Sequence, residues 1–460
     1  MITGYGDARG SDVIHFQCWG RWAMGPCRPT GRTTMTANER ERHIREIAER
    51  LAERLAAEWP AGDMTINAIE DLAERLGHDV QREVSERLLR DEAARKEGNR
   101  TACSCGGSAT YRRHHPLPLV TAAGRLEVRR AYYYCDRCRQ GRCPADARLG
   151  LGPANSTPTA QARLAVLAAL SPYVQVGDLV AQLGLPLQVD LKSTERVAQA
   201  VGQALTASPF APYGPATRPV VLGFDGIMFP TWEGNKEARC ATIYEPDWDA
   251  ARTPEGEAGL RKEYWATTDS RESLVRAACA RARARAGGGI VAVVCDGAAL
   301  DWVDLDQYLP VRVEILDFYH VLERLGEIAQ ALAPAAAGEW QATMRQALLE
   351  QGSLPLLAAL RAWEPAGETA AEVKRLQLAY FERQQARMQY PEYLRRGFPI
   401  GSGAVEGACK HVVADRFDGG GMRWKRETAD PLMQLRAAIL TQPRLDLRRF
   451  IATQPLPLVA

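Results

Sequence analysis

Two aspartates in the sequence each follow an apolar run and precede a glycine. Asp225 comes after residues 220–224, and Asp296 comes after residues 290–295. Apolar runs rich in β-branched residues predict buried strands, so each strand would carry an aspartate to the same edge of one sheet. One Asp-Gly after a strand predicts no more than a turn, whereas two of them suggest ligands that converge.

Glu406 supplies a third carboxylate, at the start of a predicted helix and just after Gly401-Ser402-Gly403. Magnesium prefers oxygen ligands and needs few protein carboxylates when a substrate phosphate completes its shell. Two Mg²⁺ or Mn²⁺ ions held by Asp225, Asp296 and Glu406 could activate a nucleophile and stabilise the leaving oxygen. We therefore predict a divalent-metal site for phosphodiester chemistry. The glycines could also bind phosphate through backbone amides, but the Lys-Ser/Thr of a P-loop does not follow them.

Asp317 and His320 form a second group, directly after a strand predicted at 311–316. Their spacing allows both side chains to face one cleft, where the histidine could position a phosphate or tune a neighbouring carboxylate. The alternative is an aspartate that caps the next helix over a packed histidine. The sequence leaves both interpretations open.

Four cysteines have the spacing of a structural zinc site. They form two pairs on either side of a strand-forming segment, Cys103 with Cys105 and Cys135 with Cys138. Two pairs on turns can supply four thiolates in a tetrahedron, and such a site leaves no open position for catalysis. The first pair is spaced C-x-C instead of C-x-x-C, so Cys143, His114 or His115 could replace a ligand; unliganded cysteines are the other possibility.

One candidate for nucleic-acid contact is a helical segment. Ser156-Thr157-Pro158 predicts a helix start, and helices are expected at 158–170 and 174–183. A third helix opens near Ser193, Thr194 and Arg196, which completes a helix-turn-helix pattern. Plain helical hairpins share this pattern, so DNA contact by this unit is one of two interpretations.

A second candidate is the locally basic region that begins at Lys410 and includes Arg416. Within it, Arg423-Trp424-Lys425-Arg426 suits contacts with a nucleic-acid backbone and stacking on an unpaired base. An exposed basic turn is the simpler alternative. The net charge of the whole chain is only +2, so contact with nucleic acid must come from local surfaces of this kind.

The elements around these residues predict a multidomain α/β protein in which a strand meander precedes alternating helices and strands. Strands are expected near 219–224, 238–244, 262–268, 290–295 and 311–316, with helices near 270–286 and 298–308. The expected divisions are a disordered or falsely included start at 1–36, a helical N-terminal domain at 37–98, a zinc-ribbon-like module at 99–150, a helix-turn-helix-like domain at 156–208, the first part of a mixed-sheet core at 217–320, a helical insertion at 321–395, the final core helix with Glu406 at 396–442, and a tail at 443–460.

Bulk composition indicates a soluble cytoplasmic protein. The 460 residues are 46% hydrophobic and 25% charged, and no apolar run approaches the length that spans a bilayer. The start lacks the features of a signal peptide. Eleven cysteines, four of them clustered, suit a reducing compartment better than a disulfide framework.

The motifs together resemble the ISKra-type transposases of bacterial insertion sequences. The residues that carry the resemblance are Gly223-Phe224-Asp225-Gly226, Cys295-Asp296-Gly297, Leu316-Asp317-Phe318-Tyr319-His320, the run from Ile400 to Lys410, Gly421-Met422-Arg423-Trp424, the Tyr-Tyr-x-Cys-x-x-Cys segment that ends at Cys138, and Ser156-Thr157-Pro158. The shortened first cysteine pair departs from the pattern.

The resemblance implies an RNase H-like core with a DDE triad of Asp225, Asp296 and Glu406, and a supporting D-x-x-H element at Asp317 and His320. It implies a transposase that acts on double-stranded DNA in the bacterial cytoplasm at the nucleoid, as at least a dimer because two element ends must meet. Two rival hypotheses are a non-catalytic, zinc-containing DNA-binding regulator and a nuclease of the same fold without strand transfer.

Overall fold

The computed structural model describes residues 37–59, 62, 65–151, 155–208, 212–247, 259–297, 299–442, 445–453 and 456. The expected start segment 1–36 and about half of the tail lie outside these residues. The chain forms two units, Met1–Leu76 and Gly77–Ala460, which are described separately. Within the described ranges, no helix is both long enough and apolar enough to cross a lipid bilayer.

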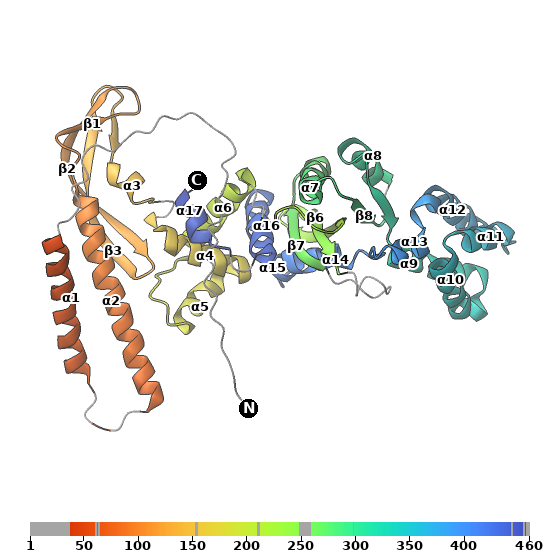
Figure 1. The fold of residues 1–460 in the computed structure, drawn as a ribbon, viewed down its shortest axis with the longest axis horizontal. Coiled ribbons are helices and arrows are strands. Elements are labelled where there is room, and N and C mark those ends of the chain that lie inside the picture. The colour runs from red at the N-terminus through yellow and green to blue at the C-terminus, as the bar shows by residue number, and fades with distance from the viewer. Residues whose placement is uncertain are drawn as a thin grey trace, which may run out of the picture. The chain divides into compact units, whose positions relative to one another are not determined.

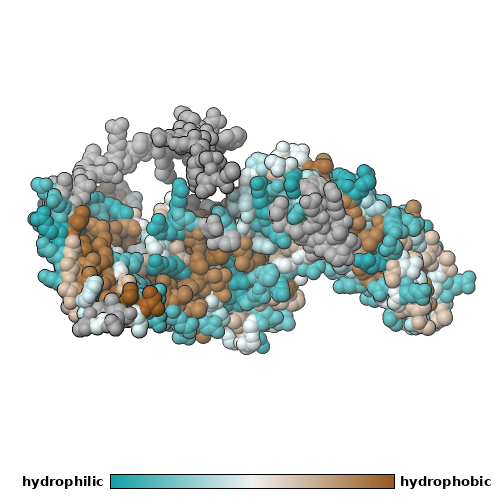
Figure 2. Space-filling view, turned by 60° about the horizontal axis from the view of Figure 1, so that its bottom comes forward, coloured by the Kyte–Doolittle hydropathy of each residue, from teal (hydrophilic) through white to brown (hydrophobic). Residues whose placement is uncertain are grey.

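The first unit contains α1 (Ala37–Glu58) and the beginning of α2 (Ile66–Ala94), as predicted from the helical periodicity (Figure 1). Arg75 Nη2 lies 3.5 Å from Glu58 Oε2 across the two helices. Large apolar side chains remain exposed here, among them Ile44 and Ile66, each 67% exposed. Figure 2 shows hydrophobic surface at its left, over these helices.

The expected domain 37–98 differs from the observed division, which falls at Leu76 inside α2. The physical reason lies at the end of that helix, where Ala93 is buried against Leu117, Leu119 and Val128 of the following sheet. That antiparallel sheet has the order β1-β2-β3-β4. Its strands are β1 (Arg100–Ala102), β2 (Ser108–Thr121), β3 (Gly124–Cys135) and β4 (Gln140–Arg142). The helix α3 (Pro144–Arg148) follows β4.

The elements of the predicted helix-turn-helix-like region are all helices or helical turns. It comprises α4 (Pro158–Leu170), the 3₁₀ turn Tyr173–Gln175, α5 (Val176–Gln182) and α6 (Leu191–Ala207). Thr157 caps α4 by accepting a hydrogen bond from Ala160 N, and Pro158 follows in the first turn, as predicted. This region shares one hydrophobic core with α16 (Arg426–Thr441) and α17 (Leu447–Thr453), including Leu164, Val201 and Leu432.

A five-stranded mixed sheet lies at the centre of the second unit, in the order β7-β6-β5-β8-β9. β5 pairs antiparallel with β6, β6 antiparallel with β7, and β8 parallel with both β5 and β9. The strands are β5 (Val220–Thr231), β6 (Gly234–Pro246), β7 (Gly259–Thr267), β8 (Val291–Cys295) and β9 (Val313–Leu316). All five predicted strands are confirmed, and the first and the fourth, β5 and β8, are neighbours.

The two faces of this sheet carry different helices (Figure 1). Leu222, Ile243 and Val293 pack under α7 (Arg271–Ala286) and α8 (Ala299–Tyr308). Val221 and Val294 face the opposite way, toward α9 (Phe318–Leu332) and the helices that follow. This alternation follows from the period-two geometry of strands.

Residues 317–402, all of which the structure describes, contain helices and turns but no strand, as predicted for the insertion. After α9 come the 3₁₀ turn Pro334–Ala336, α10 (Ala337–Gln351), α11 (Leu354–Ala362), α12 (Glu368–Gln384), the 3₁₀ turn Gln385–Arg387 and α13 (Tyr390–Arg395). The chain then returns to the sheet through α14 (Gly403–Ala408), the π turn Cys409–Ala414 and α15 (Asp415–Phe417). The expected single core helix at 396–442 is therefore divided, because its last part, α16, packs with α4 and α6.

Candidate metal sites and nucleic-acid contacts

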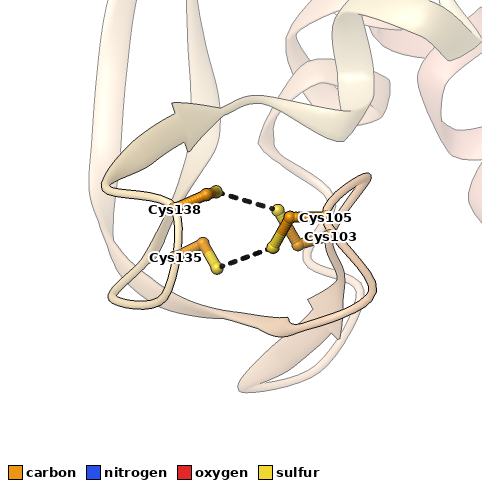
Figure 3. A group of neighbouring side chains, drawn as sticks. All are labelled: Cys103, Cys105, Cys135 and Cys138. Atoms are coloured by element: carbon orange, nitrogen blue, oxygen red, sulfur yellow. Dashed lines mark hydrogen bonds between the residues drawn. The ribbon is translucent and has the colours of Figure 1, made fainter.

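The four cysteines of the two predicted pairs lie together at one end of the small sheet (Figure 3). Cys103 and Cys105 lie between β1 and β2, while Cys135 ends β3 and Cys138 lies before β4. Cys103 Sγ is 3.6 Å from Cys138 Sγ, and Cys105 Sγ is 3.7 Å from Cys135 Sγ. A tetrahedron with Zn–S bonds of about 2.3 Å has edges of about 3.8 Å. The spacing of these thiols therefore fits a zinc ion, and the C-x-C pair is compatible with it.

The proposed substitute ligands do not join this group. Cys143 lies at the N-cap of α3. His114 Nδ1 lies 3.0 Å from Tyr111 Oη and its Nε2 lies 3.0 Å from Ala94 O. The ring of His115 lies 5.8 Å from that of Tyr132. The structure therefore groups the four cysteines of the two pairs, without Cys143, His114 or His115.

The thiols are chemically suited to be ligands, since the thiolate is the form that binds metal. A hydrogen bond from the Cys105 backbone and another from the Cys138 thiol lower the pKa of the Cys103 thiol to about 6. Burial raises the pKa of Cys138 to about 12. One thiolate among neighbouring thiols gives the group a negative charge that a cation would stabilise.

Asp225 occupies the middle of β5, which corrects the expectation that it ends a strand. The strand continues because Asp225 pairs with Cys240 and Gly226 with Arg239 of β6. Asp225 Oδ1 accepts a hydrogen bond from Gly226 N (2.7 Å), and Cys409 Sγ donates to Oδ2 (3.5 Å). Burial raises the pKa of the Asp225 carboxyl, and repulsion from Asp296 and Glu406 raises it further. The three predicted acids therefore interact electrostatically.

Asp296 directly follows the last residue of β8, just after the pairing of β8 with β5 ends. Gly223 of β5 is in register with Val294 of β8, so Asp225 and Asp296 each come two residues after paired positions on parallel strands. Gly297 has a φ of +89°, and a Cβ there would lie 2.7 Å from Tyr380 Oη. Glycine is therefore required at the position after this aspartate.

Two side chains that the sequence did not indicate hold the Asp296 turn from α12. Tyr380 Oη donates to Asp296 O (3.1 Å), and Gln384 Nε2 donates to Gly297 O (3.0 Å). Both residues come from the helical insertion, so the insertion supports the acidic site directly. No local pattern around residue 380 could have revealed this contact, because it joins positions 84 residues apart.

Glu406 is exposed in the first turn of α14, a helix that packs directly on β5. A Cβ at Gly223 would lie 3.2 Å from Val405 Cβ, so glycine allows this close approach. Thr242 Oγ1 also donates to Ala404 O (3.3 Å). Ser402 Oγ donates to Glu406 Oε1 (2.6 Å) and orients the carboxylate. These contacts explain how Glu406 reaches the sheet from beyond the insertion.

Asp317, His320 and Glu406 form a tighter group, with ligand atoms within 4.8 Å of one another; Asp225 and Asp296 do not belong to it. Asp317 is completely buried and caps α9, accepting from Tyr319 N (2.6 Å) and His320 N (3.3 Å). It also accepts from Ser402 N (3.1 Å). The two interpretations from the sequence are therefore compatible. Asp317 caps the helix, and it also belongs to an acid–histidine group that could bind a metal.

His320 lies at the open side of this group, with a side chain that is 39% exposed. Its Nδ1 is 3.3 Å from Asp317 Oδ2. The contact with the Asp317 carboxylate raises the pKa of His320 to about 9, against the opposing effect of burial. In the absence of a metal, the neighbouring carboxylates therefore favour the protonated ring.

Some of the residues predicted to contact DNA are buried, and the others are exposed. Arg416, Trp424 and Thr194 are 2%, 9% and 0% exposed, which corrects their assignment as DNA-contacting residues. Arg416 Nε donates to Ala168 O (3.2 Å), Trp424 Nε1 donates to Phe417 O (3.0 Å), and Thr194 Oγ1 donates to Asp190 O (2.9 Å). These hydrogen bonds to backbone carbonyls hold the three side chains in the interior of the protein.

The remaining predicted contacts stay accessible. Arg426 donates to Thr268 O and so has a structural bond as well. Ser193 is half-buried beside Asp190, whose carboxylate accepts from its backbone N–H (2.9 Å). The predicted contacts with exposed side chains are Lys410, Arg423, Lys425, Arg426 and Arg196.

No protein-family model and no curated protein sequence matches the chain. The fold and the sites therefore define only a broad class. The chain is a mixed α/β protein with a four-thiol group that could hold zinc and an acid–histidine group that could bind a second metal.

Proposed function

We propose that the chain is a DNA transposase that hydrolyses phosphodiester bonds at the ends of its element and joins the 3′-hydroxyl to target DNA. The observation that supports the proposal is that Asp296 and Glu406, from separate elements, lie near enough to Asp225 to raise the pKa of its carboxyl. Asp225 and Asp296 come from neighbouring parallel strands, and Glu406 comes from a helix packed on β5. The sheet order, with three antiparallel strands followed by two parallel ones, supports an RNase H-like core.

Asp225, Asp296 and Glu406 would hold two Mg²⁺ or Mn²⁺ ions. The donor set fits these hard cations, because it consists of carboxylate oxygens whose mutual repulsion a cation relieves. When bound, the ions supply Lewis acidity and an activated oxygen nucleophile.

The chain's own residues orient this site. Ser402 holds the Glu406 carboxylate, and Asp317 holds the Ser402 backbone in turn. His320 lies at the accessible edge of the group, where its N–H can donate to a phosphate oxygen of the substrate. Asp317 and His320 therefore act as positioning residues.

The four thiolates would hold a structural Zn²⁺, since all four positions of a tetrahedron are taken by sulfur. Double-stranded DNA is the proposed partner, both as element ends and as target. Because two ends must be brought together, the active form would be at least a dimer, and the setting would be the bacterial cytoplasm at the nucleoid.

The proposal is tested by incubating the purified protein with Mg²⁺ and DNA that carries the sequences flanking its coding region. Asp225→Asn should lower the cleavage rate at least about a thousandfold, because the loss of one metal ligand removes charge stabilisation in the transition state. Products joined to a second DNA would distinguish a transposase from a nuclease. Binding without cleavage by the wild-type protein would favour the non-catalytic regulator.

Asp418→Asn is the matched control, because Asp418 is an exposed acid outside the site. It should cleave at the wild-type rate. Zinc content and thermal unfolding of Asp225→Asn should equal those of the wild type. Full cleavage activity in Asp225→Asn or in Glu406→Gln would overturn the assignment of the triad.

A further inference from the structure

Trp232 is a large aromatic side chain that the fold leaves 72% exposed. It lies in the turn of the β5–β6 hairpin, between Thr231 and Gly234. The turn is held by Glu233 N, which donates to Thr231 Oγ1 (3.2 Å), and by Thr231 Oγ1, which donates to Gly234 O. An exposed indole on a fixed turn offers an aromatic face to a ligand.

The backbone of Trp232 is fixed against the basic segment that follows α15. Trp232 N donates to Trp424 O (3.1 Å), and Trp424 N donates to Pro230 O (3.2 Å). Thr231 and Trp424 thus form an isolated parallel bridge. Both bridged side chains are buried, at 4% and 9% exposure.

Trp232 directly follows the bridged Thr231, and Arg423 and Lys425 flank the bridged Trp424. All three residues are exposed. Among the described residues, neither cation forms an ion pair with a carboxylate, and the nearby Glu233 lies 3.8 Å from Lys236. The bridge therefore joins the backbone of an exposed aromatic residue to a segment that carries two exposed cations.

This arrangement has the chemistry of a single-stranded nucleic-acid site. Every base offers an aromatic face on which an indole can stack, and cations beside it bind the flanking phosphates. The sequence pattern assigned the stacking role to Trp424, but that ring is used inside the protein. The available ring comes instead from a hairpin nearly two hundred residues earlier in the chain.

We infer that Trp232, with Arg423 and Lys425, binds an unpaired nucleotide of the DNA substrate. The inference rests on the proposed function. β5 runs from Asp225 to the turn, a distance of about 20 Å at about 3.3 Å per residue. The stacked nucleotide should therefore lie several nucleotides away from the cleaved phosphate.

The test compares a blunt duplex with the same duplex carrying a single-stranded extension that contains 2-aminopurine. The full-length wild-type protein should bind the extended DNA more tightly and quench the fluorescent base, since stacking quenches it. Trp232→Ala should lose about tenfold in affinity for the extended DNA, as expected for one stacked base, and should lose the quenching. Affinity for the blunt duplex should stay unchanged, and Trp232→Phe should restore most of the preference.

Trp59→Ala is the matched control, because Trp59 is 62% exposed in the first unit. It should bind both DNAs as the wild type does. Arg423→Gln and Lys425→Gln should each reduce the slope of log affinity against log salt by about 0.7 for the extended strand. Thermal unfolding should be the same for all variants, since the backbone bonds of the bridge remain.

Two results would overturn the inference. Trp232→Ala protein that retains both affinity and quenching would exclude stacking by this ring. A loss that is equal for blunt and extended DNA would show that Trp232 does not read an unpaired base. In both cases the proposed function stands if the wild-type protein cleaves DNA. A wild-type protein that neither cleaves nor binds DNA would instead remove the proposed function itself.

Discussion

The two candidate metal sites differ in how far apart in the sequence their candidate ligands lie. The four cysteines lie between residues 103 and 138, on two turns of one small sheet. The acids and the histidine lie between residues 225 and 406, on β5, after β8 and on α9 and α14. The four-cysteine site is thus formed by residues close together in the sequence. The acidic site forms only when the strands, the helical insertion and the helix that follows it pack together.

The two sites also differ in ligand chemistry. Soft thiolates favour zinc and fill its coordination shell. Carboxylates favour Mg²⁺ or Mn²⁺ and leave room for a substrate phosphate. The comparison therefore predicts that loss of a cysteine ligand acts on folding and that loss of an acid acts on chemistry.

The largest effect on the fold is expected from Cys135→Ser. A structural zinc in a small module contributes about 10 kcal/mol or more to folding, so the module should lose both its metal and its cooperative unfolding. Metal analysis should fall from about one zinc per chain to near zero. Cys143→Ser should keep the full zinc content, because Cys143 lies outside the group. An equal loss in both variants would show that the ligands are wrongly assigned.

An intermediate effect is expected from Asp317→Ala. This buried carboxylate accepts three backbone hydrogen bonds, from Tyr319, His320 and Ser402. Their loss should lower the free energy of unfolding by about 3 kcal/mol, as measured by urea denaturation. Asp296→Ala should lower it by about 0.5 kcal/mol or less, although both variants should lose cleavage. Equal destabilisation would contradict the distinction between a positioning residue and a catalytic one.

The smallest effect on the fold is expected from gel filtration into buffer that contains no divalent metal and no chelator. Cleavage should stop, because the proposed Mg²⁺ is held weakly and retains water. Zinc content and unfolding should stay unchanged, since four thiolates bind zinc far more tightly than carboxylates bind Mg²⁺. Addition of Mg²⁺ or Mn²⁺ should restore cleavage. Restoration by Zn²⁺ alone would show that the acidic site does not have the expected preference for hard cations.

Much of the fold could be predicted because the relevant forces act locally. Local patterns predicted all five strands of the large sheet, and a composition rich in Ala, Leu, Gln and Arg predicted the helical insertion. Thr157 and Pro158 predicted the start of α4 from the chemistry of a helix cap alone. The position of Asp225 within β5 was missed, because Asp-Gly commonly ends a strand and only the pairing with β6 shows that this strand continues.

Exposure was the property that the sequence predicted least well. Arg416 and Trp424 have the residue types of a nucleic-acid surface, yet the shared core of α4, α6 and α16 buries them. Trp232 stands in an ordinary turn sequence, yet it remains exposed beside Arg423. Whether a residue contacts solvent depends on which distant elements cover it, and no local pattern records that.

The sequence by itself determined the ligand types, the two cysteine pairs and the positions of the strands along the chain, since these follow from spacing and side-chain chemistry. Tertiary structure alone decided that Asp296 and Glu406 lie near enough to Asp225 to raise the pKa of its carboxyl. Their positions depend on the parallel pairing of β5 with β8 and on the close approach of α14 at Gly223. It also decided that Tyr380 and Gln384 support the site. These contacts join residues far apart in the chain, and only the packing of the folded protein brings them together.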